Sequence, residues 1–501
     1  MSGAPDPARG HGFVAVDLGA TSGRVVLAVL TGGPGDERID LTEVGRFTNG
    51  PVEVPTADGT ALHWDLLHLW RGTLDGLRAA GVLARERGVD VAAVGIDSWA
   101  VDYGAVAADG ILLGHLRHHR DPRLTGVADE VLDRLGAADH YAVNGLQTLP
   151  FNTEFQIVAG RHDPTWPLTA SVRLVPDLVA SWLTGQVVAE VTNASTTGLV
   201  DATTRQWSLP VIEALQTAYP ELGDLRSRLA DLVEPGTVVG PLTPAVQAAT
   251  GLGAVPVVAV GSHDTASAVV GVPAEGERFA YVSSGTWSLV GLELDAPVLT
   301  EDSRRADVTN ELGVDGTVRY LKNVMGLWVL SETLRTWREA GREVTLDEAL
   351  AAAAEAAPRR TVVDLDAWEF LPPGDMPARI AAAAAATGQP VPDGVGQVVR
   401  CILDSLADAY RRVLAEVTRL AGREVDVLHV VGGGSQNVLL CRLTAEATGL
   451  PVVAGPVEGA ALGNVVVQAR AVGALHGDLT ALRRVVRRSA HVERYLPAAV
   501  R

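Results

Sequence analysis

Residues 13–30 of the chain read FVAVDLGATSGRVVLAVL, and residues 279–294 read FAYVSSGTWSLVGLEL. Each stretch is an apolar run, a turn of Gly, Ser and Thr, and a second apolar run, which predicts a β-hairpin. The turns present backbone N–H groups and hydroxyls that suit an anion. Because one hairpin lies in each half of the chain, the pattern indicates a duplicated fold whose halves bind one anionic ligand.

The bulk composition is that of a folded protein with more than one domain. The 501 residues are 47% apolar and 20% charged, and this length exceeds what one hydrophobic core usually organises. A formal net charge of −19 argues against binding to nucleic acid or to an anionic membrane. The two cysteines, Cys401 and Cys441, are too few for a disulfide framework and favour a reducing cytoplasm.

No targeting or membrane segment is evident in the sequence. The first residues, MSGAPDPARGHG, lack the apolar core of a signal peptide, and we expect a flexible tail over residues 1–11. The most apolar stretch, residues 255–272, is interrupted by Ser262, His263 and Asp264, which would be costly in lipid. We therefore expect a soluble, cytoplasmic protein.

Strand-like and helix-like segments alternate along the chain, which predicts an α/β fold. The polar segment 271–277 separates two such sets and predicts domains over residues 12–271 and 272–495. Further expectations are a strand at 41–50, a helix at 62–88, a strand pair over 89–106 and an irregular segment at 132–156. A helix over 171–185, surface helices at 351–357 and 380–388, and an amphipathic helix at 401–420 are also expected.

The first hairpin turn, from Gly19 to Arg24, has the chemistry of a phosphate site. Thr21 and Ser22 can donate hydrogen bonds, and Arg24 adds a positive charge. A strand follows the turn, which excludes the dinucleotide fingerprint, and the lysine of a P-loop is missing. Asp17 beside such a turn suits a bound Mg²⁺. An ordinary polar turn and a solvated strand-end carboxylate are the alternatives.

A second glycine turn, Gly432 to Gly434, follows an apolar strand and opens a helix for which Ser435 is a candidate N-cap. Such a turn suits the phosphates or the flat face of a nucleotide, although close strand-to-helix packing would use the same residues.

Asp264, in the string GSHDTASA (residues 261–268), comes after an apolar strand and before a helix of small residues. Open α/β folds place ligands at such strand ends. A phosphoryl acceptor must lose a proton as it attacks, and a positioned carboxylate can take it. A plain helix N-cap is the alternative role.

A polar and aromatic cluster, Asp97-Ser98-Trp99 with Asp102 and Tyr103, suits a sugar, because hydroxyls bind carboxylates and C–H faces stack on rings. A loop with a half-buried tryptophan would look the same. Asn323 follows an apolar strand and could bind a hydroxyl.

These motifs together resemble the FGGY family of carbohydrate kinases, from about Phe13 to Tyr495. The similar strings are VAVDLGATSGRV, GIDSWAVDY, PFNTEFQ, SHDTASAV, YVSSGTWSL, LKNVMGLW and VVGGGSQN, of which SHDTASA is the most specific. The resemblance implies two actin-like (ribonuclease H-like) domains around a central cleft. It also implies that ATP, with Mg²⁺, phosphorylates the 1-hydroxyl of a ketose. In the branch with the most similar motifs, that ketose is L-rhamnulose.

The resemblance also implies roles for single residues. Asp264 would accept the proton, and Asp17 would help to place the metal. The sugar would contact Ala100, His263, Asp264, Thr265 and Asn323. The nucleotide would contact Ala20, Thr21, Ser22, Gly23, Arg24, Thr286, Ser331 and Gly433.

Two of these positions depart from the family pattern. Ala100 stands where the family often has Gly, and Ser331 where Gln is expected. Another ketose, such as L-fuculose or L-xylulose, is therefore an alternative substrate, because few pocket contacts set sugar choice. A protein-binding actin-like ATPase and an inactive sugar sensor are the alternatives of other classes. The sequence leaves monomer and homodimer open.

Overall fold

The computed structural model describes residues 10–57 and 59–498. Contacts divide the chain into two compact units. The first combines the residues up to Glu275 with Leu294–Tyr320 and Gly459–Ser489, and the second combines Gly276–Glu293, Leu321–Glu458 and the residues from Ala490 onward. Each unit is thus assembled from separated segments. The sequence-continuous domains expected over 12–271 and 272–495 stay a prediction.

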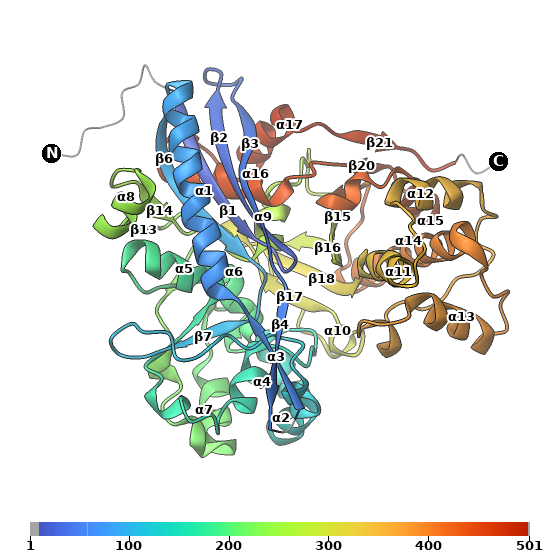
Figure 1. The fold of residues 1–501 in the computed structure, drawn as a ribbon, viewed down its shortest axis with the longest axis horizontal. Coiled ribbons are helices and arrows are strands. Elements are labelled where there is room, and N and C mark those ends of the chain that lie inside the picture. The colour runs from blue at the N-terminus through green and yellow to red at the C-terminus, as the bar shows by residue number, and fades with distance from the viewer. Residues whose placement is uncertain (1–9, 58, 499–501) are drawn as a thin grey trace. The chain divides into compact units, whose positions relative to one another are not determined.

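The first unit is built on a six-stranded sheet (Figure 1). Its order is β13 (Val238–Pro241), β14 (Pro256–Val258), β6 (Asp90–Ser98), β1 (His11–Leu18), β2 (Ser22–Thr31) and β3 (Arg38–Thr48). β1 pairs antiparallel with β2 and parallel with β6. This arrangement confirms the first hairpin and the strand predicted after it.

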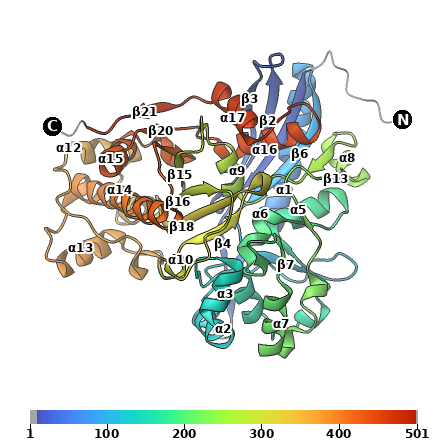
Figure 2. The ribbon, with the colours of Figure 1, turned by 180° about the vertical axis from the view of Figure 1, so that it is seen from behind.

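Helices cover both faces of this sheet (Figures 1 and 2). α1 (Leu66–Arg87) packs on β2 and β3, and α16 (Gly459–Ala471) packs on β1 and β6. Beside α16 lie α9 (Asp264–Val270) and α17 (Leu479–Ser489). α1 approaches closely because Gly76 has no side chain, and a Cβ there would overlap Val25.

Four smaller antiparallel or parallel pairs complete the strands of this unit. They are β4 (Pro51–Thr56) with β5 (Gly59–Trp64), β7 (Tyr103–Val106) with β8 (Ser171–Leu174), β9 (Ala189–Glu190) with β12 (Leu232–Val233), and β10 (Val200–Asp201) with β11 (Gln206–Trp207). Its remaining helices are α2 (Val127–Leu135), α3 (Ala137–Asn144), α4 (Thr153–Ala159), α5 (Val175–Thr184), α6 (Val191–Ala194), α7 (Leu209–Ala218), α8 (Pro244–Thr250) and α10 (Glu301–Arg305).

Four local predictions in this region were wrong in whole or in part. The helix expected from residue 62 begins at Leu66, because Asp65 caps it by accepting a hydrogen bond from the His68 amide. The segment expected to be irregular is largely helical, in α2, α3 and α4. The strand pair expected over 89–106 does not form, since β6 and β7 belong to different sheets. The helix predicted over 171–185 ends at Gly185, whose left-handed backbone confirms that end, but it begins at Val175, because Ser171–Leu174 form β8.

A seven-stranded sheet contains the second hairpin. Its order is β17 (Thr309–Leu312), β18 (Val318–Met325), β16 (Trp287–Leu294), β15 (Phe279–Ser284), β19 (Val427–Val431), β20 (Val452–Ala454) and β21 (Glu493–Tyr495). β15 and β16 pair antiparallel, as predicted. β17 and the first residues of β18 belong to the first unit, and the other strands to the second.

The helices of the second unit are α11 (Trp328–Glu339), α12 (Leu346–Glu355), α13 (Met376–Ala386), α14 (Gly394–Ala421) and α15 (Val438–Thr448). α12 and α13 confirm the alanine-rich helices. α14 confirms the amphipathic helix, since its apolar residues, three or four apart in the sequence, are all buried: Ile402, Leu403, Leu406, Tyr410, Val413, Leu414 and Val417. Among the described residues, no helix has the length and apolarity needed to cross a membrane.

Candidate active site

Asp264 is the first residue of α9, at the end of the segment that follows β14. His263 occupies the N-cap position and makes no side-chain cap hydrogen bond, so Asp264 is not the helix cap that was its alternative role. The side chain of Asp264 is 35% exposed. Its Oδ1 accepts a hydrogen bond from Oγ1 of Thr265 at 3.1 Å. The carboxylate is therefore held on one side and open to a ligand.

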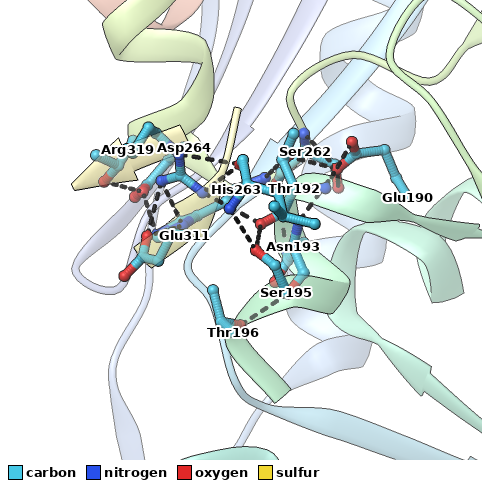
Figure 3. A network of polar contacts seen from close by, with 12 residues as sticks. Glu190, Thr192, Asn193, Ser195, Thr196, Ser262, His263, Asp264, Glu311 and Arg319 are labelled. Carbon is cyan, nitrogen blue, oxygen red and sulfur yellow. Dashed lines mark hydrogen bonds and ion pairs between the residues drawn. The ribbon is translucent and has the colours of Figure 1, made fainter. Parts of the chain in front are cut away.

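A buried carboxylate that the sequence did not reveal, Glu190 of β9, holds the backbone before Asp264 (Figure 3). It accepts hydrogen bonds from the amide and hydroxyl of Ser262 at 3.0 and 2.6 Å, and from the amide and hydroxyl of Thr192 at 2.8 and 2.6 Å. Burial raises the pKa of Glu190 although these donors oppose the shift. Glu190 thus ties the loop that ends in Asp264 to α6.

Two further carboxylates lie at the ends of neighbouring strands. Asp17 of β1 and Asp97 of β6 are paired across the sheet. Asp97 is fully buried, its Oδ2 accepts a hydrogen bond from Asn464 at 2.5 Å, and its Oδ1 has no hydrogen-bond partner among the described residues. Burial and the negative charges of Asp17 and Asp264 raise the pKa of Asp97 well above its usual range. Three carboxylates therefore act on one another in the first unit.

The polar cluster assigned to a sugar from sequence is divided in the structure. Asp97 bonds to Asn464, whereas Asp102 accepts hydrogen bonds from Trp64, Trp99 and His119 at 2.7, 2.9 and 2.8 Å. Burial raises the pKa of Asp102, but the neighbouring His119 outweighs it and the net shift is downward. Asp102 organises an aromatic cluster, and Ala100, two residues before it in the chain, is half-buried.

The carboxylate pair fits a divalent cation. Asp17 and the oxygen of Asp97 that has no hydrogen-bond partner among the described residues are hard oxygen ligands. A cation between them would relieve the repulsion between the two carboxylates. Arg24, 2.5 Å from Asp17, already relieves part of it. Within residues 10–57 and 59–498, no three His, Cys, Asp or Glu side chains form a metal cage. Mg²⁺ commonly uses only one or two protein carboxylates, together with phosphates and water.

The turn of the first hairpin is braced by Asn49. Its side-chain amide donates to the Gly19 carbonyl at 2.8 Å, and its backbone amide donates to the Thr21 carbonyl at 3.0 Å. Thr21 is exposed, and Ala20, Ser22 and Arg24 are half-buried. Gly23 is buried, and a Cβ there would overlap the ring of Phe47. Packing alone therefore accounts for this glycine, while the exposed donors remain available to a phosphate.

In the second unit, two of the three predicted nucleotide residues, Thr286 and Ser331, lie on two connected elements. Thr286, in the half-buried turn between β15 and β16, is tied to the start of α11 by the Trp328 amide, which donates to the Thr286 carbonyl at 3.2 Å. α11 also carries Ser331, which is exposed. Asn323 lies half-buried in β18. The turn and α11 therefore form one connected support.

The triple-glycine turn has two different kinds of glycine. A Cβ on Gly434 would overlap the side chain of Ser284, and a Cβ on Gly432 would lie 2.9 Å from the Ser284 carbonyl, so both pack on β15. A Cβ on Gly433 would meet nothing within 4 Å. The predicted N-cap at Ser435 was wrong: the cap of α15 is Asn437, whose Oδ1 accepts from the Leu440 amide at 3.0 Å.

Similar proteins of known name cover almost the whole chain. A rhamnulokinase of Bacteroides thetaiotaomicron is 41% identical over 97% of this chain and 96% of its own. A rhamnulokinase of Pectobacterium carotovorum is 40% identical over 97% of this chain and 93% of its own.

Solved structures of sugar and glycerol kinases have the same fold. Gluconate kinase from Lactobacillus acidophilus superposes with a TM-score of 0.77 at 15% identity, covering 98% of this chain and 94% of its own. Plasmodium falciparum glycerol kinase with ADP superposes with a TM-score of 0.75 at 15% identity, covering 97% of this chain and 94% of its own. These likenesses confirm the predicted two-domain α/β fold.

Two family models match most of the sequence. The N-terminal domain of the FGGY family of carbohydrate kinases matches residues 13–271, and the C-terminal domain matches residues 280–472. On these matches and on the relatives at 40–41% identity, this chain belongs to the FGGY family of carbohydrate kinases.

Proposed function

We propose that the chain transfers the γ-phosphoryl group of ATP to the 1-hydroxyl of L-rhamnulose, giving L-rhamnulose 1-phosphate and ADP. The observation that carries this substrate is the 41% identity to a rhamnulokinase over 97% of the chain. The string around Asp264 supports it, since sugar choice depends on few pocket contacts. Other ketoses, such as L-fuculose and L-xylulose, are the competing substrates, because Ala100 changes one of those positions.

Asp264 is the proton acceptor in this proposal. As the sugar oxygen attacks, a bond forms between it and the γ-phosphorus, the bond to the β-phosphate oxygen breaks, and the hydroxyl proton passes to the carboxylate of Asp264. The open side of that carboxylate supports the assignment. Ala100, His263, Thr265 and Asn323 would orient the sugar. Ala20 to Arg24, Thr286, Ser331 and Gly433 would bind the nucleotide.

Asp17, with the orphaned oxygen of Asp97, would hold Mg²⁺. When bound, the cation would neutralise part of the negative charge of the phosphates. Arg24 contributes a second positive charge at the same turn, and most of the rate enhancement would come from positioning and charge. The two buried free cysteines support a location in the reducing cytoplasm.

The deciding experiment is ADP release with a panel of ketoses, followed by phosphorus NMR of the product. We expect L-rhamnulose to have the highest kcat/KM and the phosphate to be on oxygen 1. Asp264→Asn should lower kcat by about 10²- to 10⁴-fold and leave nucleotide binding intact. Asp347→Asn, in the exposed first turn of α12, is the matched control. A different best ketose would reject the substrate, and wild-type turnover in Asp264→Asn would reject the base.

A further inference from the structure

Behind Asp264, the ring of His263 contacts a buried ion pair from β17 and β18, all within the first unit (Figure 3). Arg319 is fully buried, and its NH1 lies 2.8 Å from Oε2 of Glu311. The Nδ1 atom of His263 is 3.0 Å from NH1 of Arg319 and 3.2 Å from Oε2 of Glu311. A buried arginine is costly unless it is paired, and the pair with Glu311 places Arg319 against the ring of the residue before Asp264.

The direction of Arg319 is set by the backbone. Its NH2 donates to the carbonyls of Leu312 and Thr192 at 3.1 and 3.2 Å, and its Nε donates to the Leu312 carbonyl at 3.2 Å. These bonds aim NH1 at the His263 ring.

The contact at Nδ1 decides where the ring proton lies. A guanidinium nitrogen can donate a hydrogen bond but cannot accept one, so Nδ1 of His263 must accept from Arg319. Oε2 of Glu311 is within ion-pair distance of Nδ1, but no residue in the described part of the chain meets it with hydrogen-bond geometry. The neutral ring therefore carries its proton on Nε2.

That proton faces Asp264. Nε2 of His263 lies 3.4 Å from Oδ1 of Asp264, and the hydroxyl of Thr265 donates to the same oxygen at 3.1 Å. The Thr265 hydroxyl donates a hydrogen bond to Oδ1, whereas Nε2 of His263 lies within ion-pair distance of the same oxygen without hydrogen-bond geometry. Oδ2 makes no hydrogen bond with the residues that the structure describes.

We propose that Arg319 is a positioning residue that places the proton of His263 on Nε2, beside Oδ1 of Asp264, so that this oxygen is occupied by Thr265 and by the facing N–H group and Oδ2 is left to accept the substrate proton. The statement about Asp264 rests on the proposed kinase function. The tautomer of His263 does not, and it can be measured without any substrate.

The first test is the tautomer in the wild-type protein. Long-range ¹H–¹⁵N spectra of protein labelled at its 12 histidines, recorded at about pH 8, distinguish protonated from unprotonated ring nitrogens. The His263 signals are those that His263→Gln removes. We expect Nε2 protonated and Nδ1 unprotonated. A proton on Nδ1 would overturn the proposal whatever the enzyme phosphorylates.

The second test removes the ion pair as a whole. Arg319→Gln with Glu311→Gln leaves no unpaired buried charge, so this double variant is more apt to fold than either single one. On the best ketose of the panel, we expect kcat to fall about 10- to 100-fold with KM changed less than about threefold, and the single tautomer to be lost.

Arg400→Gln with Asp404→Asn removes another buried ion pair, on α14, and is the control for loss of stability. It should leave kcat and the His263 tautomer unchanged. A folded Arg319 and Glu311 double variant with wild-type kcat would refute the positioning role. If the wild-type protein phosphorylates no ketose, the proposed function fails, while the tautomer result still decides the role of Arg319.

Discussion

Replacing Gly433 by alanine separates nucleotide binding from folding. A Cβ at this position meets nothing within 4 Å, and the backbone is not in the left-handed region. The added methyl group should therefore leave the second unit intact, and loss of glycine freedom in the unfolded chain should stabilise it by about 0.4–1 kcal/mol. That corresponds to a rise in unfolding temperature of about 1–4 °C for a unit of this size.

The same methyl group would enter the space in which we place the nucleotide. One methyl group in a filled pocket costs about 1–3 kcal/mol, so the Kd of ATP should rise about 10-fold or more. Isothermal titration calorimetry with a non-hydrolysable ATP analogue measures the Kd, and calorimetric unfolding without ligand measures stability.

Two glycines provide controls for this prediction. Gly253→Ala also points into open space from an ordinary backbone conformation, so it should raise stability by a similar amount and leave the Kd of ATP unchanged. Gly434→Ala, which overlaps Ser284, should lower stability by about 1–3 kcal/mol. If Gly433→Ala is stable and binds the analogue as tightly as the wild type, Gly433 is not a nucleotide contact and the reasoning fails.

Three further predictions follow from burial and exposure. Burial raises the pKa of Cys401 to about 11 and that of Cys441 to about 12, so neither thiol should react with Ellman's reagent at about pH 8 until the protein is unfolded in guanidinium. Burial lowers the pKa of His140, but the charge of Glu154, 2.8 Å away, outweighs it and the net shift is upward. The stability from this pair should be complete below about pH 6.5 and lost as pH rises through the higher folded-state pKa, so urea unfolding of His140→Gln should depend less on pH between about 6 and 8. Ser331 is exposed on α11, so Ser331→Gln should keep the unfolding temperature and lower the KM of ATP by about two- to fivefold; an unchanged KM would remove this position from the nucleotide site.

The sequence by itself determined the hairpins, most of the helices and the string that carries Asp264. These features depend on local chemistry: the alternation of apolar residues, the glycines of turns, and the polar residues at strand ends. Local signals failed where a cap or a sheet partner decided the outcome. Asp65 delays the start of α1, Asn437 replaces Ser435 as a cap, and β7 pairs away from β6.

Only the tertiary structure decided what surrounds the reactive carboxylate. Glu190 binds the backbone of Ser262, 72 residues away in the chain, and Arg319 reaches His263 across 56 residues. Asp97 was interpreted from the sequence as part of a sugar cluster. In the structure, the negative charges of Asp17 and Asp264 act on it and raise its pKa. A buried carboxylate or guanidinium takes its role from the groups that folding brings within about 3 Å of it, and no local pattern in the chain specifies those groups.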